Sequence, residues 1–115
     1  DPKLLCTCGH ELCDQRSVSQ EHLNRMQVAR EIDGNSWSVT SGGRCPYHPD
    51  ELHRTIPADH QNCVGMDVRC NGATRGNILA AGLAAGCNAC GVASNFVHLG
   101  FRAETPPGHT TLWVY

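Results

Sequence analysis

The chain has 115 residues, of which 40% are hydrophobic and 17% charged, and its formal net charge is −2. This length is typical of one domain and too short for two, so we expect residues 1–115 to form a single, monomeric domain. Basic residues form no stripe and aromatic residues no ladder, which argues against a nucleic-acid partner. The longest apolar run, at 78–85, is far shorter than the roughly 20 residues of a membrane-spanning helix.

The first half of the chain is predicted to contain one helix and one strand. Residues 1–16 are rich in cysteine and lack periodicity, so they should form a cross-linked loop. Residues 19–32 have helical spacing, with His22 on the exposed side and an apolar stripe of Leu23, Met26, Ala29 and Ile32. Residues 36–40 alternate polar and apolar side chains and predict a strand. The proline-containing segment 44–59 should be a long irregular loop of the kind that often carries function.

The second half is predicted to alternate between strands and a helix. Residues 65–69 alternate again and indicate a strand, and the Ala- and Leu-rich residues 74–85 indicate a helix that ends at Gly86. Short strands are then expected around 91–93, 96–101 and 111–115. This order predicts an α+β fold, in which helices pack on one face of a small antiparallel sheet.

Eight cysteines are present, an even number: Cys6, Cys8, Cys13, Cys45, Cys63, Cys70, Cys87 and Cys90. They could form disulfides that compensate for a thin core in a secreted protein, or Cys6, Cys8, Cys13 and the Cys87-x-x-Cys90 pair could instead form a structural zinc site in a cytosolic one. A zinc ribbon needs two CxxC pairs, and only Cys87-x-x-Cys90 has that spacing. We therefore favour a disulfide-rich, extracellular domain, with the connectivity left open.

His60, Asp67 and His98 are candidate ligands of one catalytic zinc ion. Such a site uses three protein ligands and leaves one position open, and imidazole and carboxylate are suitable donors. Asp67 and His98 lie in two predicted strands, so their side chains converge if these strands are neighbours, with His60 coming from the preceding loop. Spacing alone is weak support, because the chain has seven histidines. His10 and His109, in loops, have no further support.

Four short segments strengthen this assignment, and they occur in one order along the chain. Residues 40–48 read TSGGRCPYH, residues 60–67 run from His60 to Asp67, residues 95–102 read NFVHLGFR, and the chain ends in WVY. These segments resemble the TSGYRCP-x-H, SxHxxGxAxD, FVHxDxR and W-x-Y motifs of the zinc D-alanyl-D-alanine carboxypeptidases. That family includes phage endolysin peptidases and shares its fold with the hedgehog signalling domain.

The resemblance implies a fold, a metal and a substrate. It implies a hedgehog-like or DD-peptidase-like fold with Zn²⁺ held by His60, Asp67 and His98. It also implies that Arg44 holds a carboxylate or carbonyl of a peptidoglycan peptide, a task that suits the planar guanidinium. His48 falls outside the ligand set and is expected to be structural or to line the pocket.

Several positions depart from the motifs. Ala58, Cys63 and Gly65 are small or packing changes, and Cys63 fits a disulfide. More important, the aspartate expected two residues after the last histidine is Gly100, and Asn95 stands where some relatives have a general base. A zinc peptidase needs a group that takes a proton from water and passes it to the leaving nitrogen. The catalytic residue is therefore unassigned, with Asp59, Glu104 or a histidine of the 44–59 loop as substitutes.

Three functions are consistent with these features. The first is a secreted zinc peptidase that hydrolyses peptidoglycan stem peptides, as a carboxypeptidase or an endopeptidase. The second is a catalytically impaired zinc-binding module that recognises cell-wall peptide or a protein partner, motivated by Asn95 and Gly100. The third is a disulfide-linked scaffold without metal.

Overall fold

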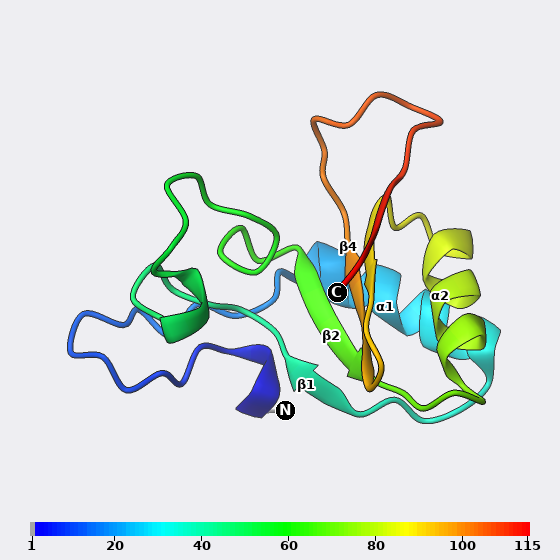
Figure 1. Cartoon of the computed structure of the whole chain (residues 1–115), viewed down its shortest axis with the longest axis horizontal. Coiled ribbons are helices and arrows are strands. Elements are labelled where there is room, and N and C mark those ends of the chain that lie inside the picture. The colour runs from blue at the N-terminus through cyan, green and yellow to red at the C-terminus, as the bar shows by residue number, and fades with distance from the viewer. Residues whose placement is uncertain (1) are drawn as a thin grey trace.

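The computed structural model describes residues 2–115 and shows an α+β fold with two α-helices and a five-stranded sheet (Figure 1). The elements are η1 (Pro2–Leu4), α1 (Gln20–Asp33), β1 (Val39–Ser41), η2 (Pro49–Glu51), β2 (Gly65–Arg69), α2 (Arg75–Ala84), β3 (Ala89–Val92), β4 (Phe96–Gly100) and β5 (Thr111–Val114). The predicted helices and strands are all present, with boundaries shifted by a few residues. Neither α-helix in residues 2–115 is long and apolar enough to cross a membrane.

The sheet has the strand order β1-β2-β4-β3-β5 and is mixed, so the prediction of a purely antiparallel sheet is wrong at one pairing. β5 pairs with β3 in parallel, whereas the other neighbours are antiparallel. The topology explains this difference. A strand that returns from the end of β4 must run antiparallel to β4, but β2 and β3 already flank it. The returning strand therefore adds outside β3, where its direction is parallel to β3.

Both helices pack on one face of the sheet, as predicted, and the other face carries polar residues. Met66, Val68, Val97 and Leu99 point to the helices and belong to the buried core. Gly82 of α2 lies against Leu99, and a Cβ at this glycine would overlap the leucine side chain. Because successive side chains of a strand point to opposite faces, Asp67 and His98 lie on the face away from the helices.

Helix α1 has the predicted limits but a different buried face. Ser19 caps its N-terminus by accepting from the His22 backbone N–H, and Gly34 ends it in the left-handed conformation. The prediction of an exposed His22 is wrong, since its side chain is 0% exposed, while Ile32 of the predicted stripe is 54% exposed. The buried stripe begins at His22 rather than at Leu23, and the imidazole can be buried because its Nε2 lies 3.1 Å from the Leu99 carbonyl oxygen.

The structure does not confirm the expected disulfides, because all eight cysteines are free. Four of them lie in or beside the N-terminal segment. Between η1 and α1, this segment contains an antiparallel bridge between Leu5 and Ser17 and no helix or strand. In Figure 1 it lies beside the loop that follows β1.

Candidate metal centre

Asp67 and His98 are directly opposite each other on the two central strands. β2 and β4 are antiparallel neighbours in which these residues form one cross-strand pair. The His98 Nδ1 atom lies 3.0 Å from the Asp67 Oδ1 atom, and both side chains are buried. The sequence made convergence of these two side chains conditional on the strands being neighbours, and the pairing of β2 with β4 meets that condition.

His60 joins this pair from the loop that precedes β2. Its Nε2 atom lies 3.2 Å from His98 Nδ1 and 3.3 Å from Asp67 Oδ1. The loop is held in place because the His60 carbonyl oxygen accepts from the backbone N–H groups of Arg44 and Cys63. Three potential ligand atoms from residues far apart in sequence therefore meet in one buried cluster.

Hydrogen bonds to the outer nitrogens of the two imidazoles orient both rings. His60 Nδ1 lies 2.6 Å from the Gly42 carbonyl oxygen, which can only accept, so Nδ1 carries the proton. His98 Nε2 lies 2.7 Å from the Asp59 carboxylate, so it also carries a proton. In the neutral rings, the lone pairs of His60 Nε2 and His98 Nδ1 then point into the cluster, which is the arrangement that metal-binding histidines adopt.

The charges in the cluster favour a cation at its centre. Burial alone raises the pKa of the Asp67 carboxyl, but its contacts with the His60 and His98 rings, whose inner nitrogens donate to it when they are protonated, outweigh burial and hold that pKa below its usual value. Burial likewise lowers the pKa of His98, but its contacts with Asp59 and Asp67 outweigh it and raise that pKa. A proton on His98 Nδ1 could form a hydrogen bond with only one of the other two atoms. A metal ion could instead be bound by His60 Nε2, Asp67 Oδ1 and His98 Nδ1 together.

The spacing of the three atoms fits a metal ion. Zinc binds imidazole nitrogen and carboxylate oxygen at about 2.0–2.2 Å in tetrahedral geometry, which separates neighbouring ligand atoms by roughly 3.3 Å. The three separations here are 3.0, 3.2 and 3.3 Å. The residues predicted from the sequence thus form a group that could hold one ion without rearrangement of the backbone.

Asp59 occupies the space beside His98 that Gly100 leaves free. A Cβ at Gly100 would lie 2.6 Å from the Asp59 Oδ2 atom and 3.0 Å from His98 Nε2. Asp59 also accepts from Arg102, whose Nε lies 2.7 Å from its Oδ1. Burial raises the pKa of Asp59, but hydrogen bonds from His98 and Arg102 outweigh it and keep the carboxyl ionised. The sequence named Asp59 only as a substitute base and gave no signal of this contact.

The cluster opens into a cleft of about 540 Å³. Its other lining residues include Arg44, Glu51, His53, Arg54, Arg102, Trp113 and Tyr115. The aromatic side chains come from β5 and the C-terminal residue, and the Trp113 ring lies 5.3 Å from the His98 ring. The closing WVY segment was the only sequence signal for this aromatic wall.

Arg44 lies at the edge of the cluster and lines the cleft. Its Nη1 contacts the buried carboxylate of Glu51 at 3.3 Å, and its Nη2 lies 3.5 Å from Asp67 Oδ2. Glu51 also accepts from Gln61 and pairs with Arg54. Sequence reasoning missed Glu51, because nothing in its irregular loop distinguishes this acid from Asp50.

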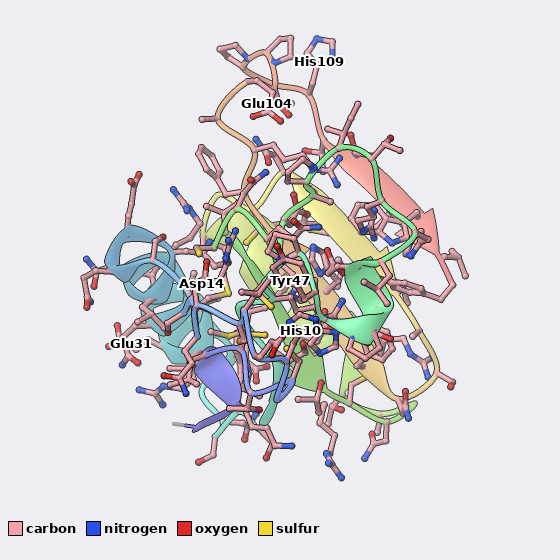
Figure 2. The ribbon with its side chains drawn as sticks, turned by 90° about the vertical axis from the view of Figure 1, so that its left-hand side faces the viewer. His10, Asp14, Glu31, Tyr47, Glu104 and His109 are labelled. Carbon is pink, nitrogen blue, oxygen red and sulfur yellow. The ribbon has the colours of Figure 1, made fainter. Side chains whose placement is uncertain are left out.

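The candidates for proton transfer lie in different places. Asn95, which stands where some relatives have a general base, comes directly before β4 and lines a separate cavity together with Arg69 and Phe96. Glu104 lies on the loop that projects between β4 and β5 (Figure 2). His48 caps η2 by accepting from the Asp50 backbone N–H, which agrees with the structural role expected for it. His53, also from the 44–59 loop, lines the cleft itself.

The chain matches no known family model, no curated protein and no solved structure. The likeness to zinc D-alanyl-D-alanine carboxypeptidases therefore consists of short motifs, and the family assignment stays a prediction.

Proposed function

We propose that this protein is a zinc-dependent peptidase that hydrolyses peptide bonds in peptidoglycan stem peptides. The observation that carries this proposal is the convergence of His60 Nε2, Asp67 Oδ1 and His98 Nδ1 at separations of 3.0–3.3 Å beside an open cleft. Two imidazoles and one carboxylate are typical of catalytic zinc sites. A zinc ion held there would polarise a scissile carbonyl and lower the pKa of a water molecule.

The residues around the ligands would keep them in position. Asp59 fixes the His98 ring through Nε2, and the Gly42 carbonyl fixes the His60 ring through Nδ1. Arg44 contacts the second carboxylate oxygen of Asp67, which leaves Oδ1 directed into the cluster. Such partners usually contribute strongly to metal affinity, because they restrict each ligand to one orientation and protonation state.

The cleft has features that suit a peptide with a free carboxylate. The Nη2 group of Arg44 makes only long contacts with protein carboxylates, at 3.5 and 3.9 Å, so it can also reach a substrate carboxylate or carbonyl. Trp113 and Tyr115 offer an apolar wall on the other side. These features support a substrate such as a stem peptide that ends in D-alanine.

His53 is the group we assign to proton transfer. Asp59 contacts the ring nitrogen of His98 that does not face the cluster, so it serves to orient that ring. His53 is exposed and lines the same cleft, and imidazole is the most common general acid–base group in enzymes. One of its ring nitrogens would accept a proton from water and return it to the leaving nitrogen.

The test is hydrolysis of purified muropeptides, followed by mass spectrometry of the fragments. The zinc-loaded protein should release stem-peptide fragments, and His60→Ala should abolish this release together with zinc binding at the His60–Asp67–His98 group. His53→Ala should keep zinc but lose about 10²- to 10⁴-fold in rate, the usual contribution of a general base. His109→Ala is the matched control, because His109 lies on the projecting loop (Figure 2) and should behave as wild type.

A second candidate is a zinc module that binds cell-wall peptide or a protein partner without cleaving it. The placement of Asp59 favours it. Among residues 2–115, Asp59 is the one carboxylate besides Asp67 that contacts His98, and it contacts the ring nitrogen that faces away from the cluster. Zinc bound at the His60–Asp67–His98 group with no fragment released would support this candidate against the peptidase. A peptidoglycan substrate also agrees with the extracellular location and monomeric state that we expect.

A further inference from the structure

Four cysteine sulfurs gather in a second cluster, separate from the His60–Asp67–His98 group. Cys6, Cys8 and Cys13 come from the N-terminal segment, and Cys45 comes from the loop after β1. Their Sγ atoms all lie within 4.8 Å of one another, and Cys8 Sγ lies 3.5 Å from Cys45 Sγ. A disulfide needs about 2.05 Å between its sulfurs, whereas four thiolates around one zinc ion lie roughly 3.8 Å apart.

A backbone N–H group is directed at one of these sulfurs. The Gln15 N–H lies 3.4 Å from the Cys13 Sγ atom. Hydrogen bonds from N–H groups stabilise thiolates rather than thiols, and they orient the sulfur atoms of metal-bound cysteines.

The N-terminal segment that carries Cys6, Cys8 and Cys13 has little buried apolar surface to stabilise its conformation. From residue 7 to residue 17 every side chain is exposed or only half-buried, and Leu12 is 61% exposed. The side chains therefore bury too little apolar surface to offset the entropy of ordering the segment. His10 stacks on Tyr47 with the ring centroids 4.4 Å apart (Figure 2), which adds one contact at the edge of the cluster.

We propose that Cys6, Cys8, Cys13 and Cys45 bind a structural zinc ion as a closed tetrathiolate site. Four thiolates would fill all four coordination positions of a tetrahedral zinc ion and leave none for water or substrate. Such a closed site is typical of structural rather than catalytic zinc. On binding, each thiol loses its proton to solvent, and the ion cross-links the N-terminal segment to the loop after β1.

A zinc ion at this site would also hold the loop that positions the residues of the His60–Asp67–His98 group. Cys45 follows Arg44, and the same loop supplies the Gly42 carbonyl that orients His60. The N-terminal segment reaches this loop through the Gly43 N–H, which donates to the Leu4 carbonyl oxygen. Residues 42–45 therefore connect the thiolate site to the residues that position His60 and Asp67.

The test uses the full chain, purified under reducing conditions and loaded with cobalt(II) in place of zinc. Wild type should show intense thiolate-to-cobalt charge-transfer absorption, which imidazole and carboxylate ligands do not produce. Cys13→Ser should lose most of this absorption. Cys63→Ser, which removes a cysteine outside the cluster, should keep it. His98→Ala should also keep it, so this test is independent of the proposed peptidase activity.

Zinc content and thiol counts complete the experiment without relying on any variant that fails to fold. Wild type should carry about two zinc ions per chain if both sites are filled, and it should release eight reactive thiols when denatured with chelator. Absent charge-transfer absorption in wild type, a mass deficit that indicates disulfides among these cysteines, or bound iron in place of zinc would overturn the proposal.

Discussion

At the residue scale, the most informative position is Gly100. From the sequence, the missing aspartate at this position suggested a lost catalytic carboxylate. In the structure, Asp59 brings a carboxylate to the same place from another part of the chain, and it contacts both His98 and Arg102. A side chain at position 100 would collide with it. Asp59 can occupy this place only because residue 100 has no side chain. A comparison of position 100 alone with the motif could not reveal this dependence.

This arrangement predicts a carboxylate exchange between positions 59 and 100. Asp59→Ala should weaken zinc binding by about 10- to 100-fold, the usual effect of removing the partner of a ligating histidine. Gly100→Asp alone should lower the free energy of unfolding by about 1–3 kcal/mol, because it overpacks a buried site. The double variant should recover most of the zinc affinity, as measured by titration with a competing chelator.

Glu104→Ala provides the control for the exchange, since it removes an acid near Asp59 that does not touch His98. Equal zinc affinity in Asp59→Ala and wild type would show that Asp59 does not orient the ligand. Purely additive effects in the double variant would show that the two positions do not share one role.

At the element scale, local patterns predicted the strands that carry the site but not the complete sheet. The strands predicted at 65–69 and 96–101 carry Asp67 and His98, and the pairing of β2 with β4 places both residues on one face. The parallel pairing of β5 depends on which sheet edges are already occupied, and this information is not local. The buried face of α1 was also predicted wrongly. His22 was expected on the exposed side because imidazole is polar, and its buried partner, the Leu99 carbonyl oxygen, cannot be known from the sequence.

Burial of His22 in α1 predicts a specific loss of stability in acid. Burial lowers the pKa of His22 to about 4 from its ordinary 6.5, so the unfolded chain binds a proton that the native chain resists. The free energy of unfolding should therefore fall as the pH decreases from 6.5 to 4, by roughly 3 kcal/mol from this residue. Urea denaturation at several pH values would measure this change.

His22→Gln isolates this effect, because the amide can still donate to the Leu99 carbonyl oxygen but does not titrate. Its stability should depend less on pH than that of wild type across the same window. Replacement of the exposed His109 by Gln should leave the pH dependence unchanged. Identical pH profiles for wild type and His22→Gln would contradict the assigned burial of a neutral imidazole.

At the scale of the whole molecule, residues 42–60 contribute to both groups of potential metal ligands. Cys45 belongs to the cysteine cluster, and His60 belongs to the group with Asp67 and His98. The grouping of His60, Asp67 and His98 could be predicted, because the motifs and the predicted strands agreed on these three residues. The cysteine cluster could not, because Cys6, Cys8 and Cys13 meet Cys45 only when a segment without secondary structure folds back on the loop after β1. The sequence therefore favoured disulfides, whereas a tetrathiolate site needs no oxidising compartment.

The central claim is that His60, Asp67 and His98 bind one zinc ion, and anomalous diffraction at the zinc absorption edge tests it most directly. Crystals grown with zinc should show a peak about 2.0–2.2 Å from His60 Nε2, Asp67 Oδ1 and His98 Nδ1. His98 Nε2 should remain hydrogen-bonded to Asp59. The absence of a peak between these three atoms, or zinc bound instead to His98 Nε2, would contradict the claim.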